Sequence, residues 1–162
     1  MDSGTAHGTT ERPAQWHTRP VTAADVELIA DLRAVVMRPD LERLGRYDEH
    51  RVRQRFRDSF SAAHTSVIVV GGEVAGSVTM RPEGGRRWLE HFYLSPHLQG
   101  RGLGSSVLRA LLEQADTQGV AVALNVLQGS PARRLYERHG FTVESEDPVD
   151  VFMARPPAGT AA

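Results

Sequence analysis

The segment from Trp88 to Leu127 constrains the fold most, because its pattern changes from strand to helix and back to strand. It predicts one strand over 88–94 and a second over 120–127. Between them, a glycine-rich loop leads into a predicted helix over 102–118, which Gly119 ends. The apolar face of that helix consists of Leu103, Val107, Leu108, Leu111, Leu112 and Ala115. Such a strand–helix–strand unit is right-handed and its strands are parallel.

The rest of the chain adds antiparallel strands and three more helices. Gly71-Gly72 and Gly84-Gly85 are turn signals that join three strands into a meander. Thr22 is an expected N-cap with Asp25 at the third helical position, and Pro39 should end that helix. The other expected elements are strands over 16–21, 66–70, 73–80, 141–143 and 149–155, and helices over 48–60 and 130–140. We therefore expect an α/β fold with a mixed, mostly antiparallel sheet and flanking helices.

The length of 162 residues suits one domain with a core and is short for two. We expect the domain to cover 16–156, between flexible tails over 1–15 and 157–162. The N-terminal residues lack the apolar run of a signal peptide, and no stretch reaches the length of a membrane span. The sequence therefore predicts a cytoplasmic protein without a membrane partner.

Composition excludes several kinds of chemistry. The chain has no cysteine, so it can form no disulfide, thiolate metal site or cysteine nucleophile. All 19 residues counted as lysine or arginine are arginine. The histidines lack the spacing of metal ligands, so we expect no metal. A formal net charge of -1 gives no field that would attract nucleic acid or an anionic membrane.

The loop before the central helix is suited to an anion. Gly100, Gly102 and Gly104 allow close backbone approach, and the first helical amides have no intrahelical partner. With the helix dipole they form a site for a phosphate or diphosphate, to which Arg101 and Ser105 can add donors. The dinucleotide fingerprint fails because Ser105 stands where the third glycine belongs, and without lysine the Walker pattern fails too. The alternative is a helix start that uses glycine for tight packing.

Two motifs extend the interpretation. Residues 94–104 read LSPHLQGRGLG, and this segment resembles the acyl-CoA-binding motif Q/R-x-x-G-x-G/A of the GCN5-related N-acetyltransferase (GNAT) superfamily. Residues 130–141 read SPARRLYERHGF, which resembles the second signature N-x-x-A-x-x-x-Y-x-x-x-G-F, and we interpret Ser130 as the counterpart of its usual asparagine. The order of elements matches as well, and the resemblance covers roughly Thr18 to Arg155.

The resemblance implies an acyl-CoA site in a V-shaped opening, where the two parallel strands splay apart. Pantetheine would pair with the backbone of Phe92, Tyr93 and Leu94. The pyrophosphate would sit on the amides of the loop formed by Gln99, Gly100, Arg101, Gly102, Leu103, Gly104 and Ser105. The cofactor's other side would be bordered by Asn125, Ser130, Ala132 and Arg133.

The same resemblance suggests roles in catalysis. Tyr136 would protonate the departing thiolate of CoA, while a backbone amide near Leu94 would stabilise the oxyanion. Glu90 and His91 are the candidates for accepting a proton from the incoming ammonium. Alternation along a strand should send these two side chains to opposite faces. We favour Glu90, because carboxylates occur in this region of many family members.

The expected reaction is direct transfer of acetyl from acetyl-CoA to a primary amine, without a covalent enzyme intermediate. A small-molecule amine is the first expectation for the acceptor, whose pocket would be built by the first two helices, their connection over 37–47 and the strand carrying Glu90. The alternatives are a protein or peptide amine, a non-catalytic acetyl-CoA-binding regulatory module, and aminoacyl-tRNA, which would require a basic stripe. A homodimer remains open, because dimers are common in the superfamily.

Overall fold

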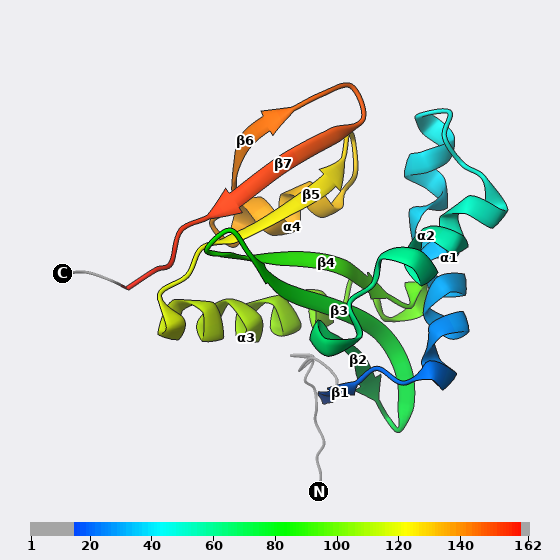
Figure 1. Ribbon diagram of the computed structural model, residues 1–162, viewed down its shortest axis with the longest axis horizontal. Coiled ribbons are helices and arrows are strands. Elements are labelled where there is room, and N and C mark those ends of the chain that lie inside the picture. Colours follow the sequence, from blue (N-terminus) through cyan, green and yellow to red (C-terminus); the bar gives the residue numbers. More distant parts are fainter. Residues whose placement is uncertain (1–14, 160–162) are drawn as a thin grey trace, which may run out of the picture.

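The computed structural model describes residues 15–159. Residues 1–14 and 160–162, which hold most of the two expected tails, lie outside that range. The described chain forms a seven-stranded mixed sheet and four α-helices (Figure 1). The strands are β1 Trp16–Pro20, β2 Thr65–Val70, β3 Glu73–Glu83, β4 Arg86–Leu94, β5 Val122–Leu127, β6 Thr142–Glu146 and β7 Asp150–Arg155. The helices are α1 Val26–Arg43, α2 Glu49–Ser59, α3 Leu103–Gln118 and α4 Ala132–Arg138.

The strand order is β1-β2-β3-β4-β5-β7-β6, and β4 with β5 is the parallel pair that the sequence predicted. This parallel pairing is short: it joins Arg87, Trp88 and Leu89 to Val122, Ala123 and Leu124. β5 continues to pair with β7 as far as Leu127, and β4 with β3 as far as Leu94. The two halves of the sheet therefore separate beyond Leu89 and Leu124. The expected splay is present.

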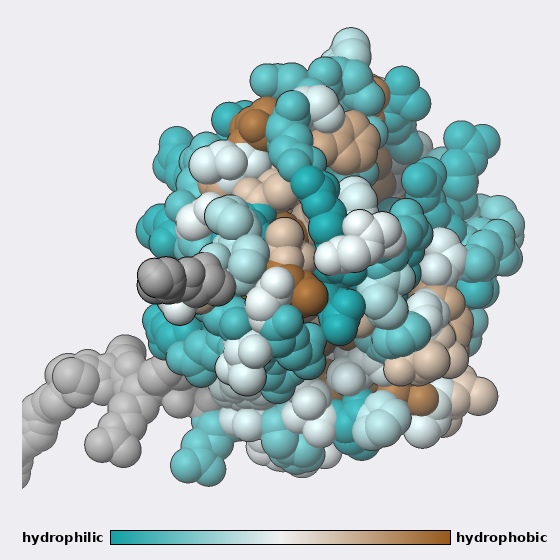
Figure 2. Space-filling view, turned by 60° about the vertical axis from the view of Figure 1, so that its left-hand side comes forward, coloured by the Kyte–Doolittle hydropathy of each residue, from teal (hydrophilic) through white to brown (hydrophobic). Residues whose placement is uncertain are grey.

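The two faces of the sheet carry two cores. One core includes Leu103, Val107 and Leu108 of α3 together with Tyr136 of α4. The other includes Ile29 and Ala30 of α1, Phe56 of α2, and β-sheet residues of the opposite face. Figure 1 shows α1 and α2 together at one side of the molecule, away from α3 and α4. Figure 2 shows a mostly hydrophilic face, on which apolar side chains gather at the floor of a central hollow.

The start of the first helical segment follows the sequence prediction. A short 3-10 helix at Ala23–Asp25 precedes α1, and the Asp25 carboxylate accepts hydrogen bonds from the Thr22 amide at 2.8 Å and the Thr22 hydroxyl at 2.9 Å. Arg19 donates to both oxygens of the same carboxylate. The hydrogen bonds from Arg19 have the largest effect on the Asp25 carboxylate. Together with those from Thr22 they hold the pKa of Asp25 well below its usual value, although burial of the side chain acts in the opposite direction.

The end of α1 corrects the sequence prediction. Pro39 should have stopped the helix, yet α1 continues to Arg43 with Pro39 inside it. Proline removes one helical hydrogen bond and crowds the preceding turn. Contacts around the last turn offset that cost: Arg43 pairs with Asp40 at 2.8 Å and also donates to the carbonyl of Gln128, far away in the sequence.

Candidate active site

The glycine loop is held between the end of β4 and the start of α3. Gly100 and Gly102 have φ values of 77° and 81°, which favour glycine, and Gly102 is the N-cap of α3. The Gln99 side chain donates through Nε2 to the carbonyl of Leu94 at 3.0 Å, so it ties the loop back to β4. The exposed Arg101 lies at the tip. The first amides of α3 have no acceptor within the helix, and anion binding there stays a prediction.

Gly104 has a packing role as well. A Cβ atom there would lie 3.3 Å from Cδ1 of Leu94 and 3.8 Å from Cδ2 of Leu135. The glycine thus lets the first turn of α3 approach both β4 and α4. Both of the alternatives for this loop, anion binding and tight packing, are compatible with its geometry, because they use different glycines.

The hydroxyl of Ser105 points toward α4 and not toward the loop. Its oxygen lies 3.1 Å from Nε2 of His139, and Nδ1 of His139 lies 2.9 Å from the carbonyl of Leu135. Because a carbonyl only accepts, Nδ1 of the neutral ring donates and Ser105 donates to Nε2. At Ser105 the amide, and not the hydroxyl, is the group left for a phosphate.

The β5–α4 side supplies the other border of the opening. Asn125 is exposed on β5, one residue past the last parallel pair with β4. Ser130 accepts a hydrogen bond from the amide of Ala132 at 3.2 Å, at the start of α4. Counted back from Tyr136, the asparagine position of the family signature falls on Gly129 and not on Ser130, which corrects the alignment expected from the sequence. Arg133 pairs with Glu137 at 3.1 Å. The structure thus brings Asn125, Ser130 and Arg133 to the side of the opening across from β4.

Tyr136 lies in the core beneath α4, with 8% of its surface exposed and its ring edge-on to Phe141. Within residues 15–159, its hydroxyl has no hydrogen-bond partner. Burial raises the pKa of this phenol well above its ordinary value, and nearby Tyr93 adds to the shift. The phenol therefore stays protonated at neutral pH, as a general acid requires.

On the other face of the sheet, β4 contains a bulge that corrects a sequence prediction. Ser77 lies opposite Tyr93 and Thr79 opposite Glu90, so two residues of β4 oppose one of β3. His91, in the bulge, has a φ of 48°. The alternation is broken there, and Glu90 and His91 both lie on the face of α1 and α2, not on opposite faces.

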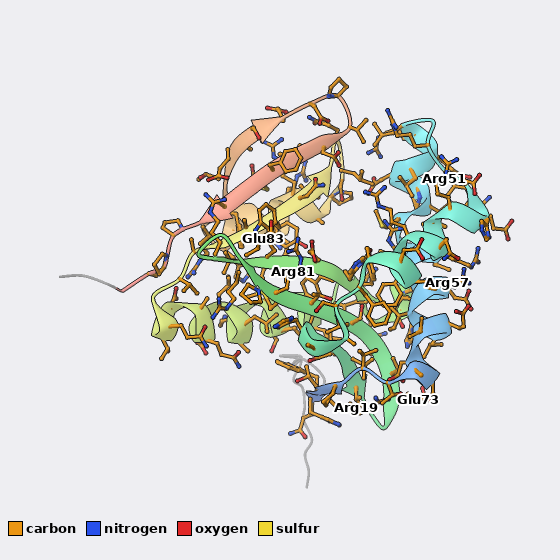
Figure 3. All side chains as sticks on the ribbon, in the orientation of Figure 1. Arg19, Arg51, Arg57, Glu73, Arg81 and Glu83 are labelled. Carbon is orange, nitrogen blue, oxygen red and sulfur yellow. The ribbon has the colours of Figure 1, made fainter. Side chains whose placement is uncertain are left out.

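The contacts of the two side chains establish that shared face. The Glu90 carboxylate binds Arg81 through both oxygens, at 2.7 and 3.0 Å. Thr79, which pairs with Glu90 across the strands, forms a hydrogen bond with the hydroxyl of Thr65 on the same face of the sheet. The His91 ring packs edge-on against Phe56 of α2, with centroids 5.0 Å apart. Figure 3 shows Arg81 on β3 near the centre of the molecule, while Arg51 and Arg57 of α2 lie toward one side.

Sequence reasoning did not single out Arg33 or Arg81. Arg33 interrupts the apolar stripe of α1, and that irregularity was the available signal. Its side chain is buried, with only 8% exposed, and it donates to the hydroxyl of Tyr93 at 2.9 Å and to the carbonyl of Val52. Burial, followed by the charge of Arg33, lowers the pKa of His91 to about 4. The ring is therefore neutral under physiological conditions.

A sequence model of the Acetyltransferase (GNAT) family matches residues 29–141. The chain belongs to the GNAT acetyltransferase family. This family assignment agrees with the acyl-CoA-dependent acetyl transfer that the sequence motifs suggested. Among solved structures, it is similar to PaiA N-acetyltransferase from Thermoplasma acidophilum in complex with coenzyme A, with a TM-score of 0.71 and 18% identity over 88% of this chain and 99% of that one. It is also similar to the ribosomal-protein-S18-alanine N-acetyltransferase from Escherichia coli, with a TM-score of 0.69 and 17% identity over 91% of this chain and 97% of that one.

Two curated relatives match a shorter part of this GNAT chain. A probable spermine N(1)-acetyltransferase of Bacillus subtilis subsp. natto (strain BEST195) is 35% identical over 65 residues, which is 38% of this chain and 43% of the relative. The spermine/spermidine N(1)-acetyltransferase of Bacillus subtilis (strain 168) is 34% identical over the same lengths. The match thus spans less than half of either relative.

Residues 15–159 lack two further features. No helix there is long and apolar enough to cross a membrane. No three histidine, aspartate or glutamate side chains in that range are grouped as metal ligands would be.

Proposed function

We propose that the chain transfers acetyl from acetyl-CoA directly to the primary amine of a small molecule. The observation that carries the proposal is the separation of β4 from β5 beyond Leu89 and Leu124, directly in front of the glycine loop. A protonated phenol at Tyr136 lies on the α3 and α4 side of that opening, and a carboxylate at Glu90 on the α1 and α2 side. The two groups needed for acid and base work thus come from opposite faces of the sheet.

In the proposed reaction, the pantetheine arm pairs with the backbone of Phe92 to Leu94, and the pyrophosphate lies on the amides that begin α3. Glu90 accepts a proton from the ammonium, and the free amine attacks the thioester carbonyl. A backbone amide near Leu94 stabilises the oxyanion. The new C–N bond forms, the C–S bond breaks, and the proton of the Tyr136 hydroxyl passes to the sulfur. The second proton of the attacking nitrogen replaces the one that Tyr136 gave up and so restores the phenol, and Glu90 releases its proton to solvent.

The names of the curated relatives make polyamines a natural class of acceptor to test. The charges near Glu90 weigh against a long polycation, however, because Arg33, Arg55 and Arg81 all act on the neighbouring His91 ring. Arg55 is exposed and, among residues 15–159, has no carboxylate within ion-pair distance. This balance favours a small amine that also carries an acidic group, such as an amino acid.

The test is CoA thiol release from acetyl-CoA with single amines: spermine, individual amino acids, aminoglycosides and short peptides. With no cysteine in the chain, a thiol-reactive dye reports the product without background from the protein. Release that depends on one small-amine class supports the proposal and identifies the acceptor. Turnover with peptides alone would favour the protein-amine alternative. Calorimetric binding of acetyl-CoA without release for any amine would contradict the transferase and favour a regulatory module.

A further inference from the structure

A chain of hydrogen bonds crosses from α1 to α2 through the bulge of β4. Nε of Arg33 donates to the Tyr93 hydroxyl oxygen at 2.9 Å, and that oxygen lies 3.0 Å from Nδ1 of His91. On the other side of the ring, Nε2 lies 3.2 Å from Oγ of Ser59, whose hydroxyl donates to the carbonyl of Arg55 at 2.5 Å. Three elements that are far apart in sequence are thereby joined at His91.

The two ends of the chain fix the direction of every bond in it. The Ser59 hydroxyl gives its one hydrogen to a carbonyl, so it accepts from Nε2 of His91. The Tyr93 oxygen accepts from a guanidinium, which only donates, and its own hydrogen is left for Nδ1. His91 is then the neutral tautomer with its proton on Nε2. Its lone pair on Nδ1 is occupied by Tyr93 and is not open to an incoming amine.

The charges around the ring favour the same protonation state. The ring is faced by Arg33 from α1, Arg55 from α2, Arg81 from β3, and Glu90 and Tyr93 from β4 itself. Three of these groups are cations and one is a carboxylate. Because the ring is also largely buried, an imidazolium there would be poorly solvated and repelled by Arg33.

The ring also anchors an unusual backbone. A φ of 48° is uncommon for a histidine and is held only where the surroundings enforce it. At His91 the surroundings are two hydrogen bonds on the ring, the edge-on contact with Phe56, and a hydrogen bond from the Ser77 hydroxyl to the His91 carbonyl at 2.7 Å. The bulge leads directly into Phe92 to Leu94, the backbone that the proposed function assigns to the acyl-CoA arm.

We infer that His91 is a positioning residue: the chain Arg33–Tyr93–His91–Ser59 holds the β4 bulge in place, and Glu90 alone accepts the proton of the acceptor amine. The inference rests on the proposed acetyl transfer. Glu90 remains accessible for this role, because its side chain is 30% exposed and Arg81 occupies only one edge of the carboxylate.

The first test needs no substrate. Nitrogen-15 chemical shifts of the labelled protein at pH 7 distinguish protonated from bare ring nitrogens, and a His91→Gln variant assigns the signal. The expected spectrum shows His91 with a proton on Nε2 and a bare Nδ1. A proton on Nδ1, or on both nitrogens, would overturn the inference. Because this readout is independent of turnover, it stands even if the panel of amines shows that the proposed function is wrong.

The second test separates the ring from the backbone that it holds. His91→Ala should lower kcat by about 100-fold through loss of positioning, with similar losses at every pH from 6 to 9. The kcat of His91→Gly should be at least about tenfold higher than that of His91→Ala, because glycine adopts positive φ without strain. Glu90→Gln should lower kcat at least as much as His91→Ala does, because it removes the group that accepts the proton. His17→Ala, exposed on the edge strand β1, serves as the matched control and should keep wild-type rates.

A base role for His91 gives a different pattern. The alanine and glycine variants would then be equally impaired, the acidic limb of the kcat/KM profile would disappear in both, and added imidazole would restore activity. That pattern would overturn the positioning role.

Discussion

At the scale of single residues, the environment of each titratable group sorts the candidates by role. Tyr136 and Tyr93 are both buried tyrosines, but the Tyr93 hydroxyl is bound by Arg33 and His91, whereas that of Tyr136 has no partner among residues 15–159. A phenol without internal partners is free to donate to a ligand. Both ring nitrogens of the adjacent His91 are engaged within the protein. The Glu90 carboxylate also has an internal partner, because Arg81 binds both of its oxygens, but 30% of its side chain remains exposed to an incoming amine.

Replacement of Tyr136 by phenylalanine tests the acid role. We expect kcat to fall by about 100-fold or more, because general acid catalysis contributes on this order. The dissociation constant for acetyl-CoA should change by less than about twofold, and stability should be retained, because no internal hydrogen bond is lost. Steady-state kinetics, calorimetry and thermal unfolding measure the three quantities. Wild-type turnover in the variant would rule out Tyr136 as the acid.

At the scale of elements, the C-terminal end of α1 connects the acceptor side to the β5–α4 loop. Arg43 donates to the carbonyl of Gln128, and its guanidinium lies over Gly129, where a Cβ would come within 2.8 Å of Nη2. The loop beyond Gly129 carries Ser130, Ala132 and Arg133, which border the proposed cofactor site. The extension of α1 past Pro39 therefore bridges the two halves of the splayed sheet.

Arg43→Ala should break this bridge. We expect a loss of about 1 kcal/mol in the free energy of unfolding, as for an exposed charge-assisted hydrogen bond, and faster amide exchange over 40–43. Gly129→Ala is strained in either background because φ is 78° there, but it should cost less in the Arg43→Ala background than in the wild type, where the new methyl group also meets the guanidinium. Glu42→Ala, which removes an exposed i,i+4 pair on the same helix, should cost no more than about 0.5 kcal/mol. Urea unfolding and hydrogen exchange provide the data, and full additivity of Arg43→Ala and Gly129→Ala would contradict the bridge.

At the scale of the whole molecule, the sheet is two antiparallel halves joined by a parallel pairing of three residues on each strand. One half is β1-β2-β3-β4 and the other is β5-β7-β6. A ligand seated between the open ends of β4 and β5 would contact both halves and the N-terminus of α3. Its binding should therefore stabilise the entire domain.

Acetyl-CoA at 100 times its dissociation constant should stabilise the folded state by about 2.7 kcal/mol. For a chain of this length, that corresponds to a rise in Tm of roughly 5–10 °C. Gly104→Val should remove the rise, because its side chain would crowd Leu94 at the loop. Gly119→Ala is the matched control at the other end of α3, where φ is 71° and space is open: it should lower Tm yet keep the ligand-induced rise. Equal rises in the Gly104 variant and the control would place the ligand elsewhere.

The sequence by itself determined the features that depend on local physics. The helical and strand periods, the Thr22 cap with Asp25, the glycine turns and the glycine loop before α3 all arise from neighbours within a few residues. The two family motifs lie on such local elements, which is why the sequence correctly placed Gln99 to Ser105 between a strand and a helix and Tyr136 on the next helix. The parallel pair of strands also followed, from the handedness of the unit between them.

Only the tertiary structure decided the features that depend on distant partners. The bulge at His91 is set by the register of β4 against β3, so no local pattern revealed that Glu90 and His91 share a face. Arg33 donates to the hydroxyl of Tyr93, which is 60 residues away in the sequence, and Arg43 donates to the carbonyl of Gln128, which is 85 residues away. Such contacts offset local costs, a buried charge in one case and a proline inside a helix in the other. Local propensity is a weak term, and packing and long-range hydrogen bonds overrule it where they are made.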